Sequence, residues 1–376
     1  MELLRSLSNR FSPALNKARR GDIGVDIGLS ALHFVQLGRG ADQQFHLHAR
    51  ASAPIDGGYE SLSASPQKIR ELIRLLLKKA PFSGRRAVVA MPAGQFRTMS
   101  INYRPRNQQS DEEAIAQLMT ERLDGPLHDY VIDCIPVRST ARDAEKLAIV
   151  AVSRREEVMN LLESLHSAGL TVEALEIAPV ALRRLANVVT SGPSDMTLML
   201  NTGRQRSYLT LLSGRRLLLD QPLDFGESML IDTLSSELDL APDQAMDLLR
   251  RTGLHPGSGQ LLVGHHEGET GIFNTLLEIL RPHFTRLVDQ TDQAFMYAAA
   301  QTRGGGDARI MLLGALARWP GCDRVLAAMT HLPVTVMPSE MSSFAPFAEG
   351  ELTTGEPHPE YAVASGLALR GLIDEQ

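Results

Sequence analysis

The stretch that decides the fold is Gly24-Val25-Asp26-Ile27-Gly28-Leu29-Ser30-Ala31-Leu32-His33-Phe34-Val35-Gln36-Leu37. Apolar and polar residues alternate up to Ile27, and β-forming residues resume at Ala31, so we expect two short strands around a tight turn. The same arrangement returns in the second half, as Met199-Leu200-Asn201-Thr202-Gly203-Arg204-Gln205-Arg206 followed by Ser207-Tyr208-Leu209-Thr210-Leu211-Leu212. In each copy a polar residue stands two positions before a glycine, and a further turn follows, at Gly38-Arg39 and at Gly214-Arg215. This internal duplication predicts two similar lobes.

The composition is that of a globular protein large enough for two cores. The chain has 376 residues, of which 43% are hydrophobic and 22% charged, as is usual for a protein that folds in water. A net charge of -6 gives no general attraction to nucleic acid, so we expect no nucleic-acid partner. We see neither a secretory signal nor an apolar run near the length of a membrane span. Cys134 and Cys322 are far apart in sequence and fit a reducing cytoplasm.

The order of predicted elements divides the chain. Residues 22–95 predict strands, the helix 65–79 and the strand 86–91, which together form the core of a first lobe. Residues 96–177 predict an αβ unit inserted in that lobe, with a helix at 108–123 and a last strand at 171–177. The remaining divisions are a basic amphipathic tail (1–21), an interlobe connection (178–194), a second lobe (195–340) and a return to the first lobe (341–376). The tail can lie on an anionic membrane surface or pack on its own lobe, and the sequence leaves both open.

Two hairpins of this kind resemble those that hold a nucleoside triphosphate between the lobes of the actin and sugar-kinase superfamily. Glycine lets backbone N–H groups approach phosphate oxygens, and the aspartate two residues earlier organises a hydrated Mg²⁺. The candidate nucleotide-binding residues are Asp26, Gly28, Ser30, Asn201, Gly203 and Gly314.

Several stretches taken in order resemble one family within that superfamily. They are Ile23-Gly24-Val25-Asp26-Ile27-Gly28, the unit inserted after Met91-Pro92, Ala168-Gly169-Leu170, and the closing segment 362–372. They are similar to PilM, the actin-like assembly protein of type IV pili, which is related to FtsA and to the cytoplasmic part of GspL. The resemblance implies an α/β fold of the actin-like (ribonuclease H-like), two-lobed ATPase type with an inserted αβ subdomain.

The same resemblance implies a scaffold in the cytoplasm, peripheral to the inner membrane, in type IV pilus or related type II secretion assembly. In the family, the inserted subdomain takes part in binding the cytoplasmic tail of a PilN-like inner-membrane protein. Other assembly components are expected as partners, and the membrane association is indirect. A strand edge or an apolar groove accepts an extended tail, so we place the docking surface on strand 96–101 and helix 108–123. The predicted contacts are Phe96, Met99, Ile101, Ile115 and Leu118.

The nucleotide motifs depart from the superfamily pattern. Neutral or bulky residues replace the expected charged, hydroxyl or glycine residues at Ala31, His33, Ala178, Asn201, Arg204, Gln205, Met246, Leu249 and Ala315. ATP hydrolysis requires a positioned base or polarising group and a well-held metal. We therefore expect no catalytic residue, a vestigial or weak nucleotide site and no cofactor, with Mg·ATP as the alternative.

Other readings remain open at this point. A working ATP-dependent nucleotide switch or sugar-type kinase is one alternative, although a kinase requires an acidic base in the interlobe cleft and none is evident. An FtsA-like filament protein is another, and it predicts a C-terminal amphipathic helix, whereas the sequence ends soon after Leu372. His46-x-His48 and His265-His266-Glu267 lack a third ligand at motif spacing, so no metal site is expected.

Overall fold

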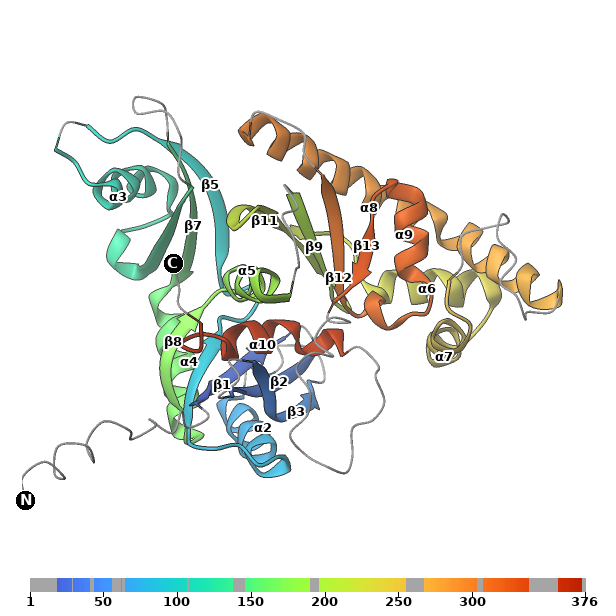
Figure 1. The fold of residues 1–376 in the computed structure, drawn as a ribbon, viewed down its shortest axis with the longest axis horizontal. Helices are drawn as coiled ribbons and strands as arrows, with labels where there is room; N and C mark the ends of the chain where they lie inside the picture. The colour runs from blue at the N-terminus through green and yellow to red at the C-terminus, as the bar shows by residue number, and fades with distance from the viewer. Residues whose placement is uncertain are drawn as a thin grey trace, which may run out of the picture.

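The computed structural model describes residues 19–28, 30–40, 44–55, 62, 65–106, 108–137, 146–189, 196–254, 267–302, 307–337 and 358–373. Two lobes, each built on a five-stranded sheet, lie side by side with helices α5 and α10 between them, and a smaller αβ unit stands on the first lobe (Figure 1). Strand β1 already begins at Arg19, inside the range predicted as a tail. The rest of that tail, residues 1–18, lies outside the described residues.

The first-lobe sheet has the strand order β3-β2-β1-β4-β8. Its strands are β1 (Arg19–Ile27), β2 (Ala31–Arg39), β3 (Phe45–Pro54), β4 (Arg86–Ala90) and β8 (Thr171–Glu176). Strands β1, β2 and β3 are antiparallel neighbours, and β4 and β8 run parallel to β1. The Gly28 N–H donates to the Ala31 carbonyl oxygen at 3.0 Å and closes the predicted turn. Asp26 is thereby paired with His33 across the hairpin.

The second-lobe sheet repeats this topology in the order β11-β10-β9-β12-β13. Its strands are β9 (Met196–Thr202), β10 (Ser207–Ser213), β11 (Arg216–Leu223), β12 (Ala308–Gly314) and β13 (Val334–Val336). Again two antiparallel pairings are followed by two parallel ones. Asn201 is paired with Tyr208, near the turn that follows β9. The predicted duplication and the actin-like, ribonuclease H-like fold are confirmed.

Successive side chains along the strands of the first sheet point to opposite faces, and each face packs against different helices. Val25 and Val89 pack with α2 (Pro66–Lys79) and α4 (Arg155–Ser167) in one core, whereas Val88 and Ala90 join the core that contains α5 (Ala178–Val189) and α10 (Ala362–Ala368). Gly24 lies against α10, because a Cβ atom there would be 2.0 Å from the Ala364 carbonyl oxygen. The same alternation turns Asp26, two residues further along β1, towards the second lobe.

The second lobe carries the remaining long helices. They are α6 (Glu227–Leu238), α7 (Pro242–Thr252), α8 (Glu267–Thr302) and α9 (Cys322–Thr330), with the short 3-10 turns η2 (Leu316–Arg318) and, before α10, η4 (Pro359–Tyr361). Helix α8 begins at Glu267. Residues 255–266 before it lie outside the described residues, as do residues 338–357, which span the boundary between the predicted second lobe and the predicted return to the first lobe.

The inserted subdomain is a three-stranded sheet in the order β5-β7-β6 with one helix packed on it. Its elements are β5 (Arg97–Tyr103), α3 (Asp111–Arg122), η1 (Leu127–Asp129), β6 (Tyr130–Val137) and β7 (Lys146–Arg154). Ser110 caps α3 by accepting a hydrogen bond from the Glu113 N–H at 3.1 Å.

The predicted range 96–177 for this subdomain is wrong at its C-terminal end. Val158, Leu161 and Leu165 of α4 pack in the first-lobe core, and β8 pairs with β4. A parallel strand needs a crossover helix to return to its sheet, and α4 serves as that crossover from the subdomain to β8. The subdomain therefore comprises residues 97–154.

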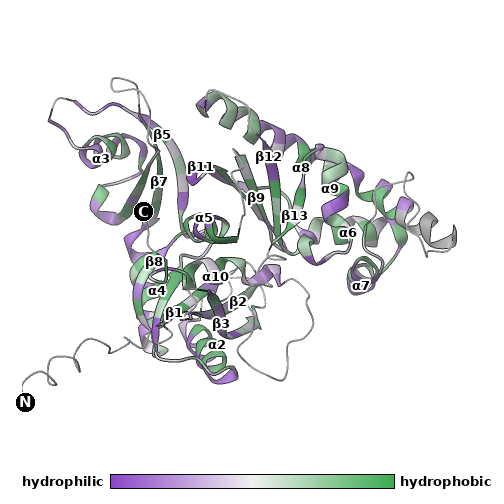
Figure 2. Cartoon of the chain, viewed as in Figure 1, coloured by the Kyte–Doolittle hydropathy of each residue, from purple (hydrophilic) through white to green (hydrophobic). Residues whose placement is uncertain are grey.

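Hydrophobic residues gather on the strands of both sheets and on α5 and α10, whereas hydrophilic residues are more frequent on the outer helices (Figure 2). Among the described residues, none of the helices is long and apolar enough to cross a membrane.

Candidate functional site

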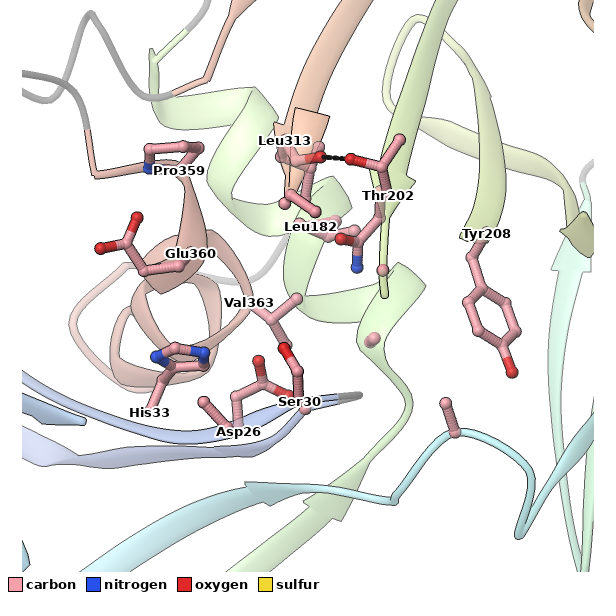
Figure 3. Close-up of a pocket in the computed structure, with 18 of the residues that line it drawn as sticks. Asp26, Ser30, His33, Leu182, Thr202, Tyr208, Leu313, Pro359, Glu360 and Val363 are labelled. Atoms are coloured by element: carbon pink, nitrogen blue, oxygen red, sulfur yellow. Dashed lines mark hydrogen bonds between the residues drawn. The ribbon is translucent and has the colours of Figure 1, made fainter. Parts of the chain in front are cut away.

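The first candidate site is an interlobe cleft of about 320 Å³ lined by both hairpins and by the segment that leads into α10. All six residues predicted from the sequence line it: Asp26, Gly28, Ser30, Asn201, Gly203 and Gly314. Asp26, Ser30 and His33 come from the first lobe, and Thr202 and Leu313 from the second (Figure 3). The structure thus brings the six positions together in one cavity between the lobes.

Asp26 lies in this cleft, and no ion pair to its carboxylate is present among the described residues. Desolvation by burial raises the pKa of its carboxyl group from 3.8 to about 7. His33, across the hairpin, is also desolvated, and its pKa is lowered to about 4 by burial, with Glu360 opposing and Arg318 adding to the effect. The His33 ring packs edge-on against Tyr361, with the ring centroids 5.2 Å apart. Near pH 7, His33 is therefore neutral and Asp26 is partly protonated.

Two backbone donors on the second-lobe side of the cleft bond within the protein. The Ala315 N–H donates to the Thr202 carbonyl oxygen at 2.6 Å, and the Leu316 N–H donates to Thr202 Oγ1 at 2.9 Å. Gly314 has φ +83°, and a Cβ atom there would be 2.0 Å from the Thr202 carbonyl oxygen. This glycine therefore permits close packing of β12 on β9, a role that explains its presence without a ligand.

The charges of the cleft lining are mostly negative. Of its lining residues, Asp26, Asp220 and Glu360 are acidic, and Arg318 is the one Lys or Arg among those described. Arg318 lies 3.8 Å from the Glu227 carboxylate, which also accepts a 3.2 Å hydrogen bond from the buried Trp319 indole. A triphosphate needs several donors or cations around its oxygens. Among the described lining residues, Arg318 is therefore the one cationic side chain available to a triphosphate.

Asp220 on β11 is a cleft residue that the sequence analysis missed. It is 7% exposed and accepts a hydrogen bond from Thr210 Oγ1 at 2.7 Å, with Thr98 Oγ1 3.3 Å from its other carboxylate oxygen. Desolvation raises its pKa to about 6, and the two threonine hydroxyls oppose that shift. A carboxylate directly after Leu217-Leu218-Leu219 was the available signal, because charged residues rarely occupy a buried strand without a partner. Tyr208, Arg318 and Glu360 were missed too.

A second cavity, of about 410 Å³, lies where the subdomain meets the first lobe. We call it the docking groove. Its walls come from β6, β7, β8, α4 and α5, and Met91, Phe96, Ile177 and Arg370 also line it. Val131 stands in it with 38% of its surface exposed.

Of the five residues predicted to contact a partner, Phe96 alone lines the docking groove. Ile101 and Ile115 are 1% and 2% exposed in the core of the subdomain, and Met99 and Leu118 pack partly buried against that core. Alternation along β5 turns Met99 and Ile101 towards α3. The assignment of Ile101 and Ile115 to a docking surface is wrong, because an apolar helix or strand face looks the same in sequence whether it meets its own sheet or a partner.

One side of the docking groove contains a buried ionic cluster. Glu176 at the end of β8 accepts two hydrogen bonds from Arg184 of α5, each 2.9 Å long, and a further one from Arg370. Arg184 also donates to the Gly366 carbonyl oxygen at 2.9 Å. The cluster fixes β8, α5 and α10 to one another. Within the described ranges no three His, Cys, Asp or Glu side chains are placed to hold a metal ion, and His265 and His266 lie outside those ranges.

Comparison with solved structures agrees with the fold. A structure described as the PilM–PilN type IV pilus biogenesis complex has 22% sequence identity and a TM-score of 0.74, covering 94% of this chain and 99% of that one. The ethanolamine utilization protein EutJ from Carboxydothermus hydrogenoformans has 13% identity and a TM-score of 0.52, covering 94% of this chain and 90% of that one. No curated protein matches the chain significantly by sequence.

A match to a family model identifies the family, which these structural similarities alone do not. The model of the type IV pilus assembly protein PilM matches residues 24–372, which span both lobes and the inserted subdomain. The chain belongs to the PilM family of type IV pilus assembly proteins.

Proposed function

We propose that the chain is a cytoplasmic scaffold of type IV pilus assembly, peripheral to the inner membrane, that docks the cytoplasmic tail of a PilN-like inner-membrane protein. Membership of the PilM family supports the assembly role. The partner is suggested by the similar solved structure, which is a complex of PilM with PilN. Other pilus or secretion components bind through surfaces that this proposal leaves unassigned.

The observation that carries the docking assignment is the groove between subdomain and first lobe. It is bordered by two edge strands, β8 of the first-lobe sheet and β6 of the subdomain sheet. An extended peptide binds by pairing its backbone with such an edge while its side chains enter adjacent pockets. Val131 and Ile135 from β6 and Ala174 and Leu175 from β8 provide an apolar lining for those side chains. We therefore move the docking site from the α3 face to this groove.

We further propose that the interlobe cleft is a vestige that neither hydrolyses ATP nor requires it. Asp26 is partly protonated near neutral pH, which weakens it as a ligand for hydrated Mg²⁺. Asn201 contributes no charge where the superfamily pattern has an acid, and among the described lining residues Arg318 alone offers a cation. The alternative, a nucleotide switch, requires that Mg·ATP bind here.

A pair of surface substitutions tests the docking site. Val131→Arg places a long cation in the groove, whereas Leu75→Arg makes a similar change on α2, at a residue that is 56% exposed on a helix that contributes no groove residue. A labelled peptide with the sequence of the PilN-like tail is titrated against each full-length protein by fluorescence anisotropy. We expect Val131→Arg to weaken binding by about tenfold or more, as loss of a central apolar contact does, and Leu75→Arg to bind as the parent does. Equal affinity of the two variants contradicts the assignment.

A further inference from the structure

The interlobe cleft and the docking groove share a wall. Met91 and Phe96 line both cavities, and they stand at the two ends of the short segment 91–96 that joins β4 to β5. A turn shapes the segment, since the Gln95 N–H donates to the Pro92 carbonyl oxygen at 3.1 Å and Gly94 has φ +95°. A molecule that moves Phe96 from the groove side therefore alters the cleft.

Both ends of this segment are fastened to walls of the docking groove. The Met91 N–H donates to the carbonyl oxygen of Glu176 at 2.7 Å, and the Glu176 side chain belongs to the ionic cluster beside the groove. At the other end, Ser153 Oγ donates to the Gln95 carbonyl oxygen at 2.6 Å. Ser153 is itself a groove residue on β7. The segment is thus held by the elements that a docked tail contacts.

The next residues along the chain reach the second lobe. Thr98 Oγ1 on β5 lies 2.8 Å from the Asp220 carbonyl oxygen and 3.3 Å from its carboxylate. Asp220 lines the cleft, and Thr210 on the neighbouring strand donates to its other carboxylate oxygen. Strand β11, which carries Asp220, packs against β5, β6 and β7. Thr98 is therefore a hydrogen-bonded link between the docking subdomain and the second lobe.

We propose that segment 91–98 couples the docking groove to the interlobe cleft. A tail bound in the groove then changes the contact between Thr98 and Asp220 and, with it, the position of the second lobe relative to the subdomain. This inference rests on the proposed docking function. Coupling between sites is reciprocal, so a change at Asp220 also alters the affinity for the tail. The cleft then passes the effect of tail binding from the subdomain to the second lobe, and this requires no nucleotide.

Hydrogen exchange of the full-length chain, with and without a saturating synthetic PilN-like tail peptide, tests the coupling. We expect slower amide exchange in β6 and β8, where the peptide lies. In addition, we expect the exchange rates in β10 and β11, residues 207–223, which contain no groove residue, to change by about fivefold or more. Thr98→Val removes the hydroxyl while keeping the side-chain shape. It should retain the protection of β6 and β8 and lose the response of β10 and β11.

Thr120→Val is the matched control, because Thr120 lies in the same subdomain and bonds only within its own helix, to the Ala116 carbonyl oxygen at 3.0 Å. It should behave as the parent does in both regions. A response confined to the groove strands in the parent protein overturns the coupling, and so does a response of β10 and β11 that survives in Thr98→Val. Absence of protection anywhere overturns instead the docking assignment on which the inference rests.

Discussion

Asp26 occupies a predicted position in surroundings that change its ionisation. Its place on β1, opposite His33 and next to the turn at Gly28, is the one that the duplicated pattern predicts. Its surroundings include a neutral His33, and desolvation by burial raises the pKa of the Asp26 carboxyl group. Ionisation of a buried carboxyl group without a compensating cation lowers the free energy of unfolding.

That cost gives a pH-dependent prediction for Asp26→Asn. The folded pKa of about 7 exceeds the unfolded value of 3.8, so the native state binds more protons between these values and the free energy of unfolding falls as pH rises through them. The fall is roughly 4 kcal/mol. The variant lacks this ionisation, so its unfolding free energy, measured by urea denaturation, should exceed that of the parent by a margin that grows from pH 4 to pH 7. Asp22→Asn on the same strand, beside the exposed Arg86, should show no such gain. A loss of stability in Asp26→Asn at pH 8 contradicts the account.

At the scale of elements, helix α10 is held by its packing on β1 and α5 and by a polar link to β8. It packs closely on β1 at Gly24 and on α5 at Gly366, where a Cβ atom would be 2.1 Å from the Ala181 carbonyl oxygen. Arg184 adds a polar link, since it bonds both Glu176 of β8 and the Gly366 carbonyl oxygen. Both partners of this ion pair are almost fully buried, so each depends on the other for compensation.

Breaking this pair should be costly, and removing both charges less so. We expect Arg184→Met to lower the free energy of unfolding by about 3 kcal/mol, because Glu176 stays buried with only Arg370 as a charged partner. Adding Glu176→Gln should recover part of that loss, since it removes the uncompensated charge. Chemical denaturation of the parent, both single variants and the double variant measures the coupling in a double-mutant cycle. Additive losses, with no recovery in the double variant, argue against a paired role for the two groups.

The elements themselves could be predicted from the sequence, but their partners could not. Alternation and turn residues located the hairpins, and the repeat at Asn201 gave the second sheet, because both signals are local. The assignment of β8 and α4 to the inserted unit failed because a strand's sequence does not state which sheet edge it joins. Ile101 and Ile115 were misplaced for a related reason, since an apolar face does not identify what covers it. Thr98 and Asp220 are 122 positions apart, and only the fold brings them together.

The whole molecule consists of two lobes, a cleft between them and a subdomain on the first lobe, which we propose serve as a framework for docking. The duplicated hairpins marked the positions around Asp26 and Asn201, and the family resemblance added Gly314; all six line the cavity. The docking groove was not predictable, because it is formed by β6, β7, β8, α4 and α5 together, and no single stretch of sequence indicates it. The central claim is that this framework works without a bound nucleotide.

The most direct test is the melting temperature of the full-length protein with and without millimolar Mg·ATP, with magnesium alone as the control. A ligand at about 100 times its Kd stabilises the folded state by about 2.7 kcal/mol, which shifts the melting temperature of a protein of this size by roughly several degrees. We predict no rise beyond that seen with magnesium alone. A reproducible rise of several degrees that requires ATP, and that Asp26→Asn abolishes, would contradict the account.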